Sequence, residues 1–113
     1  MLDAYGRRCA VTGERTLPVL DAAHIQSYLG PGSNHLQNGL SLRSDIHRLF
    51  DAGYVTVTPD LRFEVSRRLK EDFENGRAYY DLSGRPLLIL PKDESKRPSR
   101  HALEWHASNV FRS

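Results

Sequence analysis

Cysteine and long apolar runs are what this chain of 113 residues most plainly lacks. Cys9 is the only cysteine, which excludes an internal disulfide and argues against a structural zinc domain. No cysteine-activating motif surrounds it, so it is interpreted as a small buried hydrophobe. The longest apolar run, residues 87–90, is much shorter than the roughly 18 residues of a membrane span. Packing alone must therefore stabilise the fold.

A secretory signal is also absent, because Asp3 stands where a basic region should be. We therefore expect a cytoplasmic protein with no membrane association. The net charge of +2 and the pI near 8.9 are only mildly basic, so composition alone does not name a nucleic-acid partner. Short basic clusters at residues 7–8, 67–70 and 96–100 could contact phosphates, or could be ordinary solvated surface with acids interspersed.

The length predicts one small domain with a single core. Residues 2–5, closed by Gly6, resemble the last turn of a helix with a glycine C-cap. A chain that starts in the last turn of a helix suggests the C-terminal part of a longer protein. We therefore expect a preceding domain that is missing here.

The middle of the chain is predicted to form a strand, a long loop, a second strand and a helix. Pro18 stands at the start of the first strand, where proline is tolerated. Ser44 is a good N-cap, and the apolar residues that follow it have helical spacing up to Gly53. A long Gly- and Pro-rich loop inside a compact domain is more often functional than idle. The expected elements are strand 17–25, loop 28–38, strand 38–42 and helix 44–53, with Ile46, Leu49 and Phe50 on its apolar face.

The remainder is predicted to add a hairpin and further helices. Pro91 should stop a strand at residues 87–90, and Ser99 should cap a final amphipathic helix that carries Trp105 near its middle. The fold class is therefore α+β, a single small domain. The elements expected here are the hairpin 54–58 and 61–65, the helix 67–74, the strand 87–90, an exposed linker 92–98 and the last helix, with Leu103, His106 or Ala107, and Val110 on one face.

A candidate metal site lies in the helix after Ser44. His47 and Asp51 are four residues apart, so they lie on one side of that helix on successive turns. An imidazole nitrogen and a carboxylate oxygen could hold one divalent cation, with Mg²⁺ or Mn²⁺ preferred and Zn²⁺ or Ni²⁺ tolerated. The plain alternative is a solvent-facing carboxylate beside a surface histidine.

Two polar residues on the strands strengthen this hypothesis. His24 ends the first strand, which should lie against the helix, and a histidine held near a metal-bound phosphate is a natural base for activating water. Asn38 opens the second strand and could brace both the loop and the imidazole of His24. Taken singly, His24 could instead be a partly buried structural histidine, and Asn38 an ordinary turn residue.

Together, these residues resemble the HNH endonuclease family and its ββα-metal fold. The resemblance is close over residues 5–58 and looser over the tail, including residues 84–87 and 105–106. Its motifs are Cys-x-x-Thr-Gly at 9–13, Ala-Ala-His-Ile at 22–25, Asn-Gly-Leu-x-Leu at 38–42 and Asp-Ile-His-x-Leu-Phe-Asp-x-Gly at 45–53.

The resemblance implies a role for each matching residue. His24 would be the general base, Asn38 its orienting residue, His47 a metal ligand and Asp51 a further ligand. Many family members carry another ligand directly before the base, where this chain has Ala23. Side-chain alternation places Asp21 on the same face as Ala23, so Asp21 is a candidate third ligand, directly or through water; it could equally cap the strand or pair with an arginine.

The function implied is hydrolysis of DNA, with selectivity supplied by the missing part of a longer restriction protein. The ββα unit would enter the minor groove and contact the backbone. A homodimer would supply the two active sites needed to cut both strands. The alternative is a non-catalytic nucleic-acid or protein interaction module on the same scaffold. His35, in the loop, could approach a phosphate, although a solvated loop histidine is favoured. His101 and His106 lie near the last helix, and His106 is interpreted as a packing or capping residue.

Overall fold

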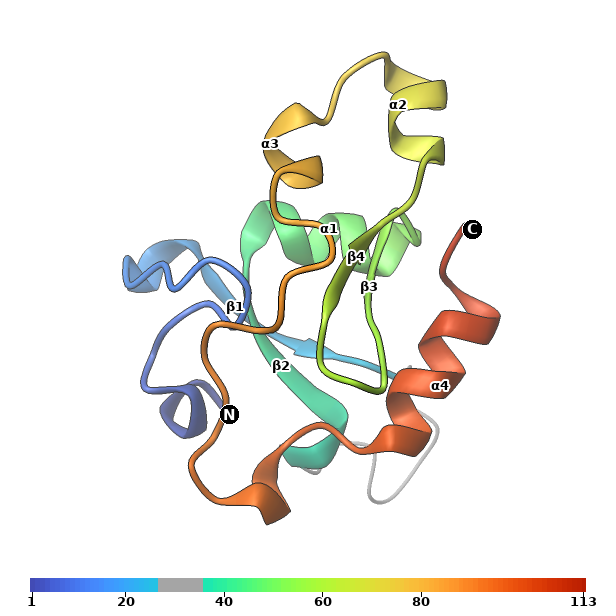
Figure 1. Cartoon of the computed structure of the whole chain (residues 1–113). Helices are drawn as coiled ribbons and strands as arrows, with labels where there is room; N and C mark the ends of the chain where they lie inside the picture. Colours follow the sequence, from blue (N-terminus) through green and yellow to red (C-terminus); the bar gives the residue numbers. More distant parts are fainter. Residues whose placement is uncertain (27–35) are drawn as a thin grey trace.

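The computed structural model describes residues 1–26 and 36–113 and has α+β architecture. Two separate two-stranded antiparallel sheets lie near the middle of the molecule (Figure 1). Helix α1 covers the first sheet, and helix α4 lies beside the second. The Gly- and Pro-rich loop expected at 28–38 and His35 lie largely or wholly outside the described residues.

The first sheet pairs strand β1, Leu20–His24, with strand β2, Gly39–Arg43. The register runs from Leu20 opposite Arg43 to His24 opposite Gly39. The first strand is shorter than predicted, because Leu17–Val19 forms a 3-10 turn with Pro18 near its start. Asn38 likewise ends a 3-10 turn, Leu36–Asn38, directly before β2. Both polar residues of the predicted site thus sit at the same end of this sheet.

Helix α1 spans Ser44–Ala52 and follows β2 without a break. The predicted N-cap is wrong by one residue: Arg43 occupies the cap position, and Ser44 is already helical. The Ser44 hydroxyl instead donates to the carbonyl of Val19, 3.0 Å away. Gly53 ends the helix as predicted, in the left-handed conformation with φ of 86°. Ile46 and Phe50 are buried, as expected from the apolar spacing.

The hairpin is confirmed as strands β3, Val55–Val57, and β4, Phe63–Val65. Helices α2, Arg68–Phe73, and α3, Arg77–Tyr80, then project from the body as a separate excursion (Figure 1). Only the first of these two helices was predicted.

The strand predicted at residues 87–90 is wrong. The amide of Leu87 donates to the carbonyl of Leu61, and those of Leu88 and Ile89 both donate to Ala10. These bonds go to two different segments, so no continuous ladder forms. The apolar run instead crosses the surface of the core, and Leu87 is buried while Leu88 is exposed.

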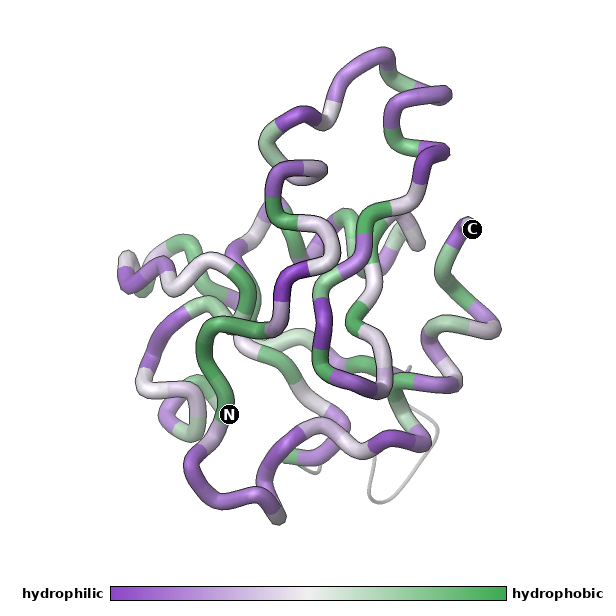
Figure 2. Tube along the Cα trace, in the orientation of Figure 1, coloured by the Kyte–Doolittle hydropathy of each residue, from purple (hydrophilic) through white to green (hydrophobic). Residues whose placement is uncertain are grey.

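Helix α4, Arg100–Asn109, begins at the predicted cap, where the Ser99 hydroxyl accepts a hydrogen bond from the amide of Ala102. Residues 92–98 contain one 3-10 turn, Glu94–Lys96, and are mostly exposed, as predicted. Hydropathy mapped on the trace shows apolar residues gathered in the strands and in residues 87–90, and a largely hydrophilic α2–α3 excursion (Figure 2). The core therefore lies between the two sheets, α1 and α4.

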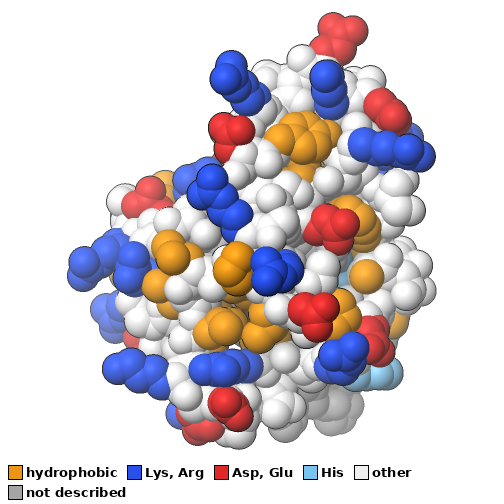
Figure 3. Space-filling model, viewed as in Figure 1, with side chains coloured by type: hydrophobic (Ala, Val, Ile, Leu, Met, Phe, Trp, Pro, Cys, Tyr) orange, Lys and Arg blue, Asp and Glu red, His pale blue; other side chains and the backbone are white. Residues whose placement is uncertain are grey.

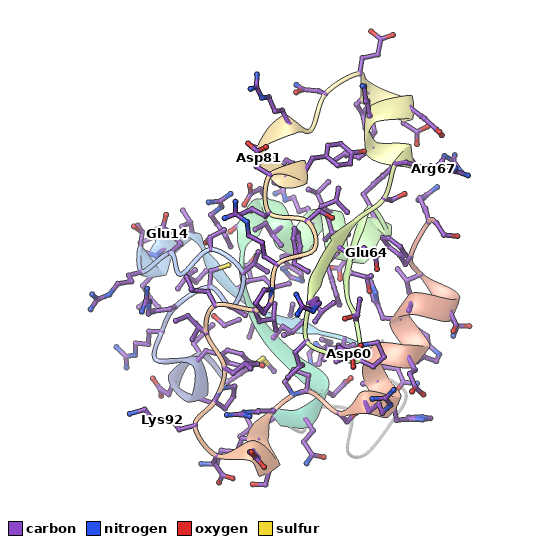
Figure 4. The ribbon with its side chains drawn as sticks, viewed as in Figure 1. Glu14, Asp60, Glu64, Arg67, Asp81 and Lys92 are labelled. Carbon is purple, nitrogen blue, oxygen red and sulfur yellow. The ribbon has the colours of Figure 1, made fainter. Side chains whose placement is uncertain are left out.

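Charge is spread over the surface. Basic and acidic side chains are interspersed on the face seen in Figure 3, and the charged side chains labelled in Figure 4 come from several separate elements. Among the described residues, no helix is long and apolar enough to cross a membrane.

Candidate functional site

His47 lies between two carboxylates. Its Nδ1 atom is 2.9 Å from Oδ2 of Asp21, and its Nε2 atom is 3.1 Å from Oδ2 of Asp51. The imidazole is a quarter exposed, and the exposed fractions of the two carboxylate side chains are 40% and 60%. The structure therefore brings all three predicted metal-site residues together around one ring, at the surface of the molecule.

Local folding explains this arrangement. The i, i+4 spacing on α1 places Asp51 one turn beyond His47. Asp21 comes from β1, which packs against α1, and reaches the opposite edge of the imidazole. One ring thus links the strand to the helix.

The donor set at Nε2 fits a divalent cation. Two ligands on adjacent corners of an octahedron, each about 2.1 Å from the ion, are separated by about 3.0 Å. The separation between His47 Nε2 and Asp51 Oδ2, 3.1 Å, matches that value. Within residues 1–26 and 36–113, however, no group of three His, Cys, Asp or Glu residues is arranged to hold one ion.

The reason lies in which edge of the ring each carboxylate contacts. Asp21 and Asp51 approach different nitrogens of His47, so they do not converge on one point. Ala23, where many family members have a ligand, is fully buried. In the described part of the chain, the candidate ligand pair is therefore Nε2 of His47 and Oδ2 of Asp51.

His24 shares a pocket with this pair. The pocket has a volume of about 360 Å³ and is lined by residues of β1, α1 and α4: Ala22, His24, Ile25, His47, Asp51, Trp105, His106 and Val110. His24 is exposed at the end of β1. The predicted base and the predicted ligand pair thus open onto the same space.

Asn38 braces the chain next to His24. Its Oδ1 accepts a hydrogen bond from the Gln26 amide at 2.9 Å, and its Nδ2 donates to the Gln26 carbonyl at 3.1 Å. The carbonyl of Asn38 also accepts from the amide of Ile25 at 3.0 Å. These bonds hold both residues that follow His24, and the role of Asn38 toward the imidazole stays a prediction.

The start of α1 is fixed by a second cluster. Asp45 accepts two hydrogen bonds from Arg43, at 2.7 and 3.0 Å, and a third from Tyr79 at 2.8 Å. Burial raises the pKa of the Asp45 carboxyl, but these hydrogen bonds outweigh it and hold that pKa below its ordinary value. Asp45 therefore orients the helix that carries His47 while lying outside the metal-ligand pair.

His106 joins α4 to the other side of α1. Its Nε2 lies 2.9 Å from the carbonyl of Phe50, which can only accept, so Nε2 carries the proton. Its Nδ1 then accepts from the Thr56 hydroxyl, 2.7 Å away. The ring also stacks on Phe50, with centroids 3.7 Å apart. His106 is thus a packing residue, as predicted, although it touches the wall of the pocket.

Sequence reasoning missed the contribution of α4 to the site. Trp105 lines the pocket, whereas the sequence suggested only that it lies near the middle of the last helix. No local signal reveals such a contact, because α4 is distant from the HNH-like motifs along the chain. His101 is exposed near the start of α4 and does not line the pocket.

Residues 9–58 match the family model described as HNH endonuclease. This segment, which is less than half of the chain, contains β1, β2 and α1.

A solved structure gives the same fold. The chain is similar to a modification-dependent TagI restriction endonuclease, with a TM-score of 0.61 and 22% sequence identity. The similarity covers 96% of this chain but 35% of that protein, so this chain spans about a third of its length. At this identity the likeness establishes the fold alone. A search of curated proteins found no match.

Proposed function

We propose that the protein is a metal-dependent endonuclease that hydrolyses phosphodiester bonds in DNA. The observation that carries this proposal is the 3.1 Å separation of His47 Nε2 and Asp51 Oδ2, in a pocket that also contains His24. The ligand pair could bind a hard cation, and the exposed imidazole could accept a proton from water. Together these two groups could activate water next to a phosphate.

His47 and Asp51 would hold the ion, with Mg²⁺ or Mn²⁺ preferred and Zn²⁺ or Ni²⁺ tolerated. When bound, the cation would stabilise the charge that develops on the scissile phosphate and the leaving 3′ oxygen. His24 would take a proton from the attacking water, leaving a 5′ phosphate on the product. Asn38 would keep His24 in place through its two hydrogen bonds to Gln26.

Asp21 is best explained as a residue that acts on the metal through His47. An Nδ1–H that donates to Asp21 leaves Nε2 as the free lone pair, which faces Asp51. Carboxylates commonly orient metal-binding histidines in this way. Direct ligation by Asp21 is the competing assignment, and the two differ in the effect of Asp21→Asn described below.

The biological role proposed is restriction of foreign or modified DNA in the cytoplasm. The structural neighbour is a modification-dependent restriction endonuclease, which supports this role. Because the neighbour is much longer than this chain, we propose that an additional domain reads the DNA. Two copies of the chain would then cut the two strands.

The test is conversion of supercoiled plasmid to nicked circles by the full chain with Mg²⁺ or Mn²⁺. We expect nicking that EDTA abolishes, and at least a hundredfold slower nicking by His24→Ala, in line with the usual contribution of a general base of about 10² to 10⁴. His101→Ala, at an exposed position outside the pocket, should nick at the wild-type rate.

A second function is favoured by one observation. Ala23 is fully buried at a position where many relatives have a ligand, and a scaffold with fewer ligands could bind DNA without cutting it. In that case wild type and His24→Ala would be equally inactive while both still bind DNA. That result would refute the enzyme and leave an interaction module.

A further inference from the structure

The active-site pocket has an apolar wall as well as a polar one. His24, His47 and Asp51 supply imidazole and carboxylate groups, whereas Ile25, Trp105 and Val110 supply apolar surface. Trp105 is the only tryptophan of the chain and is half-buried, so part of its indole remains accessible. A nucleotide has the same two-sided character, with a charged phosphate and a flat base on a sugar.

The position of Trp105 is fixed by its neighbour in the chain. His106 is fully buried and bonds to both Phe50 and Thr56, so it attaches α4 to α1 and β3. The backbone carbonyl of Trp105 also accepts a hydrogen bond from the side chain of Asn109, 2.9 Å away. The part of α4 that carries the indole is therefore attached to α1, the helix of His47 and Asp51.

The chain beyond α4 adds a second attachment. The amide of Arg112 donates to the carbonyl of Gly53 at 2.8 Å, and its guanidinium donates to the carbonyl of Ala52 at 2.9 Å. These bonds join the C-terminal tail to the end of α1, directly after Asp51. Helix α4 is thus attached to α1 both through His106 and through the tail that follows the helix.

The size of the pocket suits a small part of a substrate. A volume of about 360 Å³ is near the lower end of the range of roughly 300–1,000 Å³ typical of ligand pockets. Ala22, whose side chain is a single methyl group, is another of the lining residues. Aromatic side chains beside phosphate-binding groups commonly stack on nucleic-acid bases.

We propose that Trp105 binds the nucleotide adjoining the scissile phosphate, by contact of the indole with its base or sugar. This inference rests on the proposed nuclease function and assigns a substrate-positioning residue to it. Helix α4, outside the segment that matches the family model, therefore completes the substrate site.

Because Trp105 is the sole tryptophan, its fluorescence reports on this contact directly. The full chain would be titrated with a short double-stranded oligonucleotide in EDTA, while fluorescence anisotropy of a label on the DNA measures binding independently. We expect the tryptophan emission to change with the same midpoint as the anisotropy. Unchanged emission at saturating DNA would overturn the proposal.

Two variants of Trp105 test the same contact through the KM for nicking. Trp105→Ala should raise the KM for nicking roughly ten- to a hundredfold, the range expected for loss of one base–aromatic contact, whereas Trp105→Phe should retain most of the affinity. A wild-type KM for Trp105→Ala would contradict the proposal and leave the nuclease function intact. Failure of the wild-type chain both to bind the oligonucleotide and to nick plasmid with Mg²⁺ or Mn²⁺ would instead refute the nuclease function and this inference together.

Discussion

The carboxylate of Asp21 contacts Nδ1 of His47 at 2.9 Å and so connects strand β1 to helix α1. The contact predicts how substitutions at Asp21 act on metal affinity. Asp21→Asn retains an oxygen that can accept from Nδ1–H, so it should weaken Mn²⁺ binding only slightly. Asp21→Ala removes the acceptor and should weaken binding by about 10- to 100-fold. Isothermal titration calorimetry measures both.

The competing assignment gives a different pattern. If Asp21 binds the ion directly, Asp21→Asn should weaken Mn²⁺ binding as much as His47→Ala does. A readout independent of metal is the ¹⁵N NMR spectrum of His47 in the metal-free protein. Loss of the Nδ1–H tautomer in Asp21→Ala is expected only if Asp21 orients the ring, and Asp60→Asn, at an exposed position, is the matched control.

His106 should make folding stability depend on pH. Burial lowers the pKa of His106 from its ordinary value of 6.5, because the charged ring would lose its hydration, and only part of this is offset by the bond to Phe50. The unfolded chain therefore binds a proton more readily than the folded chain does. Stability is fully present above about pH 6.5 and falls as the pH drops through the lower folded value.

The measurement is the free energy of unfolding in urea above and below pH 6.5, for wild type and His106→Gln. The variant should be less stable by about 2–4 kcal/mol at the higher pH, because it loses stacking and disturbs two buried hydrogen bonds. The free energy of unfolding of His106→Gln should also fall less than that of wild type when the pH is lowered. An unchanged pH dependence would show that His106 does not cause it.

Ser41 is a position where substitution should be harmless. It is fully buried in β2, and its hydroxyl has no hydrogen-bond partner among the described residues. Ser41→Ala removes an uncompensated polar atom, so we expect unchanged or higher thermal stability. Ser66→Ala is the control, because that buried hydroxyl donates to the carbonyl of Arg112 and accepts from the amide of Arg68. A lower Tm for Ser41→Ala than for Ser66→Ala would contradict this prediction.

Gly53 is needed for two separate reasons. Its φ of 86° lies in the left-handed region, and a Cβ atom there would clash with the carbonyl of Val110. Gly84 has nearly the same φ, 84°, but open space around it. Gly84→Ala should therefore cost about 1–2 kcal/mol for the backbone alone, and Gly53→Ala distinctly more. If thermal unfolding shows equal losses of stability for Gly53→Ala and Gly84→Ala, the backbone at Val110 moves aside at little cost.

The central unit could be predicted from the sequence because its signals are local. The apolar spacing of Ile46 and Phe50, and Gly53 at the end, define α1, and the same helix places His47 and Asp51 one turn apart. Asp21 was predicted near the metal site from side-chain alternation in a strand. In the structure, Asp21 contacts Nδ1 of His47 and does not converge with Asp51 on one point. This contact depends on how β1 packs on α1, and the alternation of side chains along a strand does not specify that packing.

Other features depend on contacts between distant segments. Residues 87–90 have the composition of a strand, but their amides bond to Ala10 and Leu61 instead of to one continuous partner. Ser44 has the chemistry of an N-cap, yet β2 passes directly into α1 at Arg43. Trp105 reaches the pocket through the anchoring of its helix by His106. None of these follows from local periodicity.

The most direct test of the central claim is calorimetric titration of Mn²⁺ into the wild-type chain, His47→Ala and Asp51→Ala, with Asp60→Ala as the control. The ligand pair predicts one site per chain in wild type and in the control, and at least tenfold weaker binding in each of the other two variants. Wild-type affinity in both His47→Ala and Asp51→Ala would contradict the assignment of these residues as the metal site.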